Sequence, residues 1–102
     1  MPGDQNYLTV RLRDGRVMAY AQYGAPDGTV VVNAHGGLAC RLDVAAADGA
    51  ARAAGVRLIS PDRPGIGGSD PSPGRTILDW AGDVGELMDH LEVEALSVMG
   101  WS

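Results

Sequence analysis

Residues 56–70 read VRLISPDRPGIGGSD. Residues 56–60, which include Val56, Leu58 and Ile59, predict a β-strand. A loop rich in proline and glycine follows and extends from Pro61 to Gly74. Gly55, directly before the strand, is a residue type that commonly stands just past the end of a helix. We therefore expect a helix before this strand and a long loop after it.

The chain before this stretch contains three further strand patterns and one helix pattern. Residues 7–12 and 17–23 are rich in strand formers and are joined through Asp14-Gly15, which predicts a β-hairpin. Residues 29–33 form a β-branched apolar run that is typical of a strand buried on both faces. Residues 44–54 are mostly alanine and predict a helix.

The chain after the loop contains the strongest helix pattern. Thr76 and Asp79 have the spacing of a capping box, with Asp in place of the usual Glu or Gln. One apolar face follows at helical spacing: Ile77, Trp80, Ala81, Val84, Leu87, Met88 and Leu91. Residues 96–99 predict a short strand, and Gly100-Trp101-Ser102 comes directly after it.

The order hairpin, strand, helix, strand, helix, strand predicts an α/β fold. Strands that alternate with helices indicate right-handed crossovers and a parallel sheet covered on both faces. The strand 96–99 would leave an unpaired apolar edge if the sheet stopped there. We therefore expect residues 1–102 to be the N-terminal part of a single, longer domain.

Composition narrows the classes of partner. The net charge of the chain is −5, which argues against nucleic acid or an anionic membrane surface as the main partner. Cys40 is the single cysteine, so an intrachain disulfide is excluded, which fits a reducing cytoplasm. We see no signal peptide pattern and no apolar run near the ~20 residues that a membrane span needs. We expect a cytoplasmic location.

Three motifs stand directly after predicted strands: His35-Gly36-Gly37, the segment 62–70, and Gly100-Trp101-Ser102. Together they resemble the α/β-hydrolase family, in the branch with H-G-G and D-R-x-G-x-G-x-S motifs, over residues 7–102. That branch includes esterases, proline iminopeptidases, cofactor-free haloperoxidases and C–C bond hydrolases. The resemblance implies an N-terminal β-hairpin followed by parallel βαβ units of a doubly wound sheet.

The resemblance also implies a nucleophile, Ser102, in a nucleophile elbow, a sharp strand–turn–helix in which Gly100 supplies the small residue two positions earlier. Gly37, or Leu38 if the loop is shifted by one, would donate a backbone N–H to the oxyanion hole. The implied chemistry is two-step acyl transfer on a carboxylic ester, without metal or organic cofactor. The catalytic acid and histidine would lie beyond residue 102, so this stretch alone is expected to be inactive. The alternative interpretations are a surface serine after a strand and a simple Gly-Gly turn.

Other residues near these motifs have shaping roles under the same resemblance. His35 and Gly36 would shape the oxyanion loop, and Trp101 would line the pocket or pack under the elbow. The residues expected to brace the structural loop are Asp62, Arg63, Gly65, Gly67 and Ser69. Cys40 is interpreted as a buried small residue or as part of the pocket entrance. Surface or capping roles are expected for Asp43, Asp70, Asp79, Asp83, Glu86 and Asp89.

The choice among related activities depends on single residues. A serine at position 102 argues against the haloalkane dehalogenase and epoxide hydrolase branches, which resemble this one upstream but use Asp. The motifs differ from the iminopeptidase pattern at Leu38-Ala39 and Pro64, which favours a general ester hydrolase. A non-catalytic small-molecule-binding protein on the same fold remains an alternative. The expected partners are a small acyl substrate and the C-terminal remainder of the protein.

Overall fold

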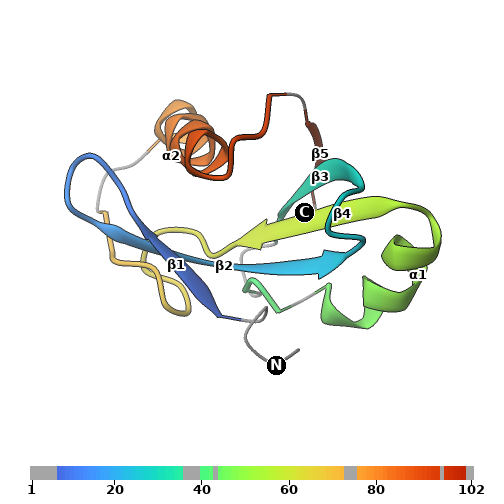
Figure 1. Ribbon diagram of the computed structural model, residues 1–102. Helices are drawn as coiled ribbons and strands as arrows, with labels where there is room; N and C mark the ends of the chain where they lie inside the picture. Colours follow the sequence, from blue (N-terminus) through green and yellow to red (C-terminus); the bar gives the residue numbers. More distant parts are fainter. Residues whose placement is uncertain (1–6, 36–39, 43, 73–75, 95, 101–102) are drawn as a thin grey trace.

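A computed structural model describes residues 7–35, 40–42, 44–72, 76–94 and 96–100. In these residues one mixed sheet has the strand order β1-β2-β4-β3-β5 (Figure 1). The strands are β1 (Leu8–Arg11), β2 (Val17–Gly24), β3 (Thr29–Ala34), β4 (Val56–Pro61) and β5 (Ser97–Gly100). The helices are α1 (Asp48–Ala53), preceded by the 3-10 turn Ala45–Ala47, and α2 (Ile77–His90).

The sheet combines an antiparallel hairpin with a parallel part. β1 pairs with β2, and β2 pairs with β4, both antiparallel. β3 lies between β4 and β5 and is parallel to both. The expected hairpin and the expected parallel strands are therefore confirmed, and the mixed sheet with its helices is an α/β fold.

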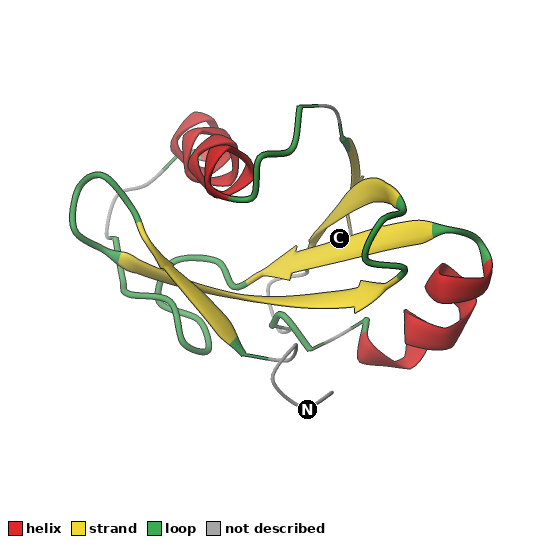
Figure 2. Cartoon of the chain, viewed as in Figure 1, coloured by secondary structure: helices red, strands yellow, loops and turns green. Residues whose placement is uncertain are grey.

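Both faces of the sheet are covered, as Figure 2 shows, with α2 over one face and α1 over the other. Val32, Ile59 and Tyr20 belong to a core cluster that includes Leu87 and Met88 of α2. Their neighbours in sequence point the other way, into a second cluster with Ala51 of α1: Val31, Leu58 and Ala21. This alternation is the period of two of a strand and confirms burial on both faces.

The helix before β4 is shorter than the alanine-rich run predicted. Only Asp48–Ala53 is α-helical, and the residues before it form a 3-10 turn. Alanine has a high intrinsic helix propensity, but a helix of this length depends on tertiary contacts. The Asp48 carboxylate accepts the Gly24 N–H at 2.7 Å, which attaches the start of α1 to the end of β2. Gly55 has a φ of +70° and ends the helix as expected.

α2 begins as the sequence predicts. The Thr76 hydroxyl accepts the Asp79 N–H at 3.2 Å, and the Asp79 carboxylate accepts the Thr76 N–H at 3.0 Å, which completes the capping box. Leu87 and Met88 are buried, and Trp80, Val84 and Leu91 pack against them. Ala81, assigned to the same face, is exposed. None of the helices in the described ranges is long and apolar enough to cross a membrane.

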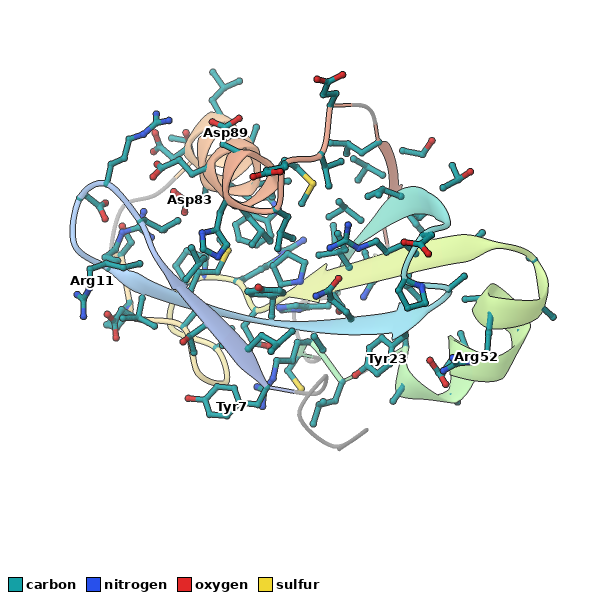
Figure 3. The ribbon with its side chains drawn as sticks, viewed as in Figure 1. Tyr7, Arg11, Tyr23, Arg52, Asp83 and Asp89 are labelled. Atoms are coloured by element: carbon teal, nitrogen blue, oxygen red, sulfur yellow. The ribbon has the colours of Figure 1, made fainter. Side chains whose placement is uncertain are left out.

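The expectation that Asp83 lies at the surface is wrong. Its side chain is buried on the side of α2 that faces the β1–β2 hairpin (Figure 3). Arg16, directly before β2, donates to both carboxylate oxygens of Asp83, from Nη2 at 2.8 Å and from Nη1 at 3.2 Å. The two residues are 67 positions apart, so no local pattern could have indicated the pair.

Candidate active site

The candidate site lies at the carboxyl edge of the parallel strands. Because β4, β3 and β5 are parallel neighbours, the residues that follow them leave the sheet at the same edge. Ala34 of β3 is paired with Gly100 of β5. In open α/β sheets, ligands commonly bind outside this edge. His35 follows β3, and Asp62 and Arg63 follow β4, so they are candidates for shaping a site.

His35 is fully buried and connects two of these strand ends. Its Nε2 accepts the backbone N–H of Arg63 at 3.0 Å. A nitrogen that accepts a hydrogen bond carries no proton, so in this arrangement Nε2 cannot act as a donor. The imidazole therefore joins the end of β3 to the loop after β4.

Asp62 is fully buried and its carboxylate accepts hydrogen bonds from two different segments. Oδ1 accepts the Arg41 backbone N–H at 2.6 Å, and Oδ2 accepts Arg41 Nη1 at 2.8 Å. Oδ2 also accepts the Gly68 N–H at 2.9 Å. A buried carboxylate is tolerated only when it is paired and hydrogen-bonded, and these donors meet that requirement.

The loop after Asp62 folds back over this carboxylate. Gly67 has a φ of +55°, and a Cβ at this position would collide with the Asp62 carboxylate. Gly65 also has a positive φ, +79°. Ser69 Oγ donates to the Asp62 carbonyl at 2.9 Å and accepts the Ala19 N–H at 2.9 Å. The loop is therefore attached both to the end of β4 and to β2.

Several residues here were not singled out by the sequence. Arg41 belongs to no motif, and its distance of six residues from His35 is the only signal the sequence offers. Asn33 and Ser60 are fully buried, and Asn33 Nδ2 donates to Ser60 Oγ at 3.1 Å between β3 and β4. Cys40 is half-buried, which does not decide between its two interpretations.

Within the part of the chain that the structure describes, the buried Nε of Arg63 has no hydrogen-bond partner. The remaining predicted site residues lie outside the described residues: Gly36, Gly37, Leu38, Trp101 and Ser102. Among the residues with described positions, no group of three or more His, Cys, Asp or Glu side chains could hold a metal ion.

Solved structures with a fold similar to that of this chain include several hydrolases. An epoxide hydrolase from Vigna radiata superposes with a TM-score of 0.81 and 25% identity over 98% of this chain and 32% of its own. A hydrolase from Pseudomonas aeruginosa PA01 matches with a TM-score of 0.79 and 26% identity, over 97% of this chain and 37% of its own. An esterase from Exiguobacterium antarcticum matches with a TM-score of 0.79 and 25% identity, over 92% of this chain and 35% of its own.

The chain thus spans about a third of the length of the solved structures it matches. No protein-family model matches the chain, and a search of curated proteins found no match either. The similarity is therefore one of tertiary structure along nearly the whole of this chain.

Proposed function

On the premise that this chain has the α/β-hydrolase fold, we propose that the protein is a serine hydrolase that acts on a carboxylic ester through a covalent acyl-enzyme. The observation that carries the proposal is the register of β3 and β5, in which Ala34 is paired with Gly100. The two candidate catalytic segments, 35–38 and 101–102, follow these paired residues directly.

The register supports a shared reaction centre. Adjacent strands lie about 4.8 Å apart, so two segments that leave paired residues start side by side. Gly37 is three residues past Ala34, and Ser102 is two residues past Gly100. A backbone N–H from the first segment and a hydroxyl from the second can then act on one carbonyl group.

The proposed reaction follows from these groups. Ser102 Oγ attacks the ester carbonyl, and the charge that develops on the carbonyl oxygen is stabilised by the Gly37 N–H and by the N–H of the residue after Ser102. A general base takes the Ser102 hydroxyl proton and passes it to the departing alcohol, and water then releases the acyl group from Ser102 as a carboxylic acid. We place Leu38 as the alternative donor in the first segment.

Neither described histidine is placed to be the general base. His35 is buried and its Nε2 already accepts the Arg63 N–H. His90 is exposed at the end of α2. We therefore propose that the base, and the acid that orients it, come from a part of the protein beyond residue 102.

The residue at position 102 favours an ester over an epoxide. The structural neighbours include both an epoxide hydrolase and an esterase. Opening an epoxide in this fold family is expected to use an Asp nucleophile, whereas this chain has Ser. A serine hydroxyl with an oxyanion hole is suited to acyl transfer.

The proposal is tested on the full-length protein with an active-site fluorophosphonate and intact-mass analysis. We expect a single adduct on the wild type, loss of the adduct in Ser102→Ala, and hydrolysis of a p-nitrophenyl ester that disappears in the same variant. Ser97→Ala is the matched control, because Ser97 is an exposed serine of β5 that stands five residues before Ser102 in the sequence. A folded wild type that forms no adduct would overturn the proposal in favour of a non-catalytic binding protein.

A further inference from the structure

We infer that Arg41 is a positioning residue for this reaction: its ion pair with Asp62 fixes the chain on the carboxyl side of Gly37. The inference rests on the proposed function, since it concerns the segment to which the oxyanion donor is assigned there. Arg41 itself would touch neither the substrate nor the reacting atoms.

Two adjacent residues hold both ends of the segment that contains Gly37. On the amino side, the Arg63 N–H donates to His35 Nε2 at 3.0 Å. On the carboxyl side, Asp62 accepts the Arg41 N–H at 2.6 Å and Arg41 Nη1 at 2.8 Å. Residues 36–40 therefore run between two points that are anchored to the same dipeptide at the end of β4.

The surroundings make the carboxyl-side anchor stiff. The Asp62 side chain is fully buried, and the Arg41 side chain is only 14% exposed, so water competes little with their ion pair. The centroid of the Tyr7 ring, just before β1, lies 4.6 Å from the Arg41 guanidinium carbon. Such a contact between a cation and an aromatic ring adds to the ordering of the guanidinium.

The side chain of Arg41 can be altered without removing every partner of Asp62. The Asp62 carboxylate would keep two backbone donors, the N–H groups of Arg41 and Gly68. The loop after β4 would also keep the bonds of Ser69 to Asp62 and Ala19. Loss of the guanidinium therefore removes the side-chain bond of this anchor and keeps the backbone bond, so it loosens the chain at residue 41 without detaching the loop after β4.

The expected catalytic effect follows from the geometry of an oxyanion hole. Its donors act only when they lie about 2.7–3.1 Å from the developing charge, and loss of one donor costs about 100- to 1000-fold in kcat. A donor that is displaced by about 1 Å rather than removed can cost about 100-fold. Substrate binding is affected less, because this contact strengthens in the transition state.

The test compares Arg41→Met and Arg41→Lys with the wild type in the full-length protein. We measure kcat and KM for a p-nitrophenyl ester, and hydrogen–deuterium exchange of the peptide that covers residues 36–42. Arg41→Met should lower kcat by about 10- to 100-fold, change KM by less than about threefold, and accelerate exchange in that peptide. Arg41→Lys should recover most of the loss, since its ammonium group can still pair with Asp62. Arg52→Met is the matched control, because Arg52 is an exposed arginine of α1 that pairs with Asp48 at 3.1 Å.

The outcomes separate the inference from the proposed function. An unchanged kcat in Arg41→Met, or unchanged exchange of residues 36–42, overturns the positioning role. If Arg41→Met loses its near-ultraviolet circular dichroism, Arg41→Gln takes its place. A smaller loss of kcat is then expected, because the neutral amide can donate a hydrogen bond to Asp62 but cannot form the ion pair. A wild type without ester hydrolysis and without a Ser102 adduct overturns the proposed function itself, and this is visible before any Arg41 variant is made.

Discussion

The pairing of Arg16 with Asp83 allows a sharp test of how α2 is held on the hairpin. The Asp83 side chain is 3% exposed and accepts two hydrogen bonds from Arg16, whose side chain is 15% exposed. These bonds raise the pKa of the Arg16 guanidinium above its ordinary value. Arg16 has a second partner, Asp14, at 2.7 Å, but the Asp14 side chain is 50% exposed. The Arg16 guanidinium thus pairs with a buried carboxylate, that of Asp83, and with a half-exposed carboxylate, that of Asp14.

The expected cost of Asp83→Asn follows from this burial. Breaking a buried ion pair by removing one partner costs about 3–5 kcal/mol. Arg16 would retain Asp14, and asparagine would still accept one hydrogen bond, so we expect about 2–3 kcal/mol. That is a large part of the roughly 5–15 kcal/mol by which native proteins are typically stable. Asp14→Asn should cost less than about 1 kcal/mol, as exposed ion pairs do.

The assay is urea unfolding of the purified protein, followed by circular dichroism. With a slope of about 1–2 kcal/mol per molar urea, Asp83→Asn should lower the midpoint by about 1–3 M. The double variant Arg16→Met with Asp83→Leu should recover most of this loss, because a buried pair can be replaced by apolar side chains of similar size. Equal midpoint shifts for Asp83→Asn and Asp14→Asn would refute the reasoning from burial.

Three further substitutions test other parts of the structure by the same unfolding assay. Gly67→Ala should destabilise the protein by about 2 kcal/mol or more. The reason is that Gly67 has a φ of +55° and that an added Cβ would collide with the Asp62 carboxylate. An unfolding midpoint equal to that of the wild type would contradict this packing. Burial raises the pKa of Tyr20, so the folded protein holds the phenol proton more tightly than the unfolded chain does. This contributes stability below the ordinary tyrosine pKa of about 10. The contribution is lost as the pH rises through the folded-state pKa. Between pH 9 and 11 the midpoint should therefore fall more in the wild type than in Tyr20→Phe, and parallel curves would argue against this linkage. Thr76→Ala should lower the free energy of unfolding by about 1 kcal/mol, because it removes the N-cap of α2. Ser97→Ala is the control, since Ser97 is exposed and its loss should leave the unfolding midpoint unchanged.

Features that depend on neighbours in sequence could be predicted from the sequence. The hairpin through Asp14-Gly15, the capping box of Thr76 and Asp79, and the end of α1 at Gly55 all involve contacts within a few residues. The burial of β3 on both faces follows from its unbroken apolar run. The three motifs after strands also indicated the fold that the structural comparisons show.

The candidate site could be predicted only in part. His35, Asp62 and Ser69 were singled out by their motifs, and the structure places all three among buried hydrogen bonds. The ion pair of Asp62 with Arg41 was missed, because the two residues lie 21 positions apart and arginine alone carries no pattern. The nucleophile assignment to Ser102 stays a prediction from the sequence.

The sequence by itself thus determined which segments become strands and helices, because backbone propensity, capping and side-chain periodicity act over short distances along the chain. Only the tertiary structure decided that β2 pairs with β4 rather than with β3, which follows it in the chain. Only the tertiary structure, likewise, buried Asp83 against Arg16 and brought Arg41 to Asp62. These contacts depend on how the whole sheet is assembled. A buried charge is stable only when a partner lies beside it, and in both pairs that partner comes from a distant part of the chain.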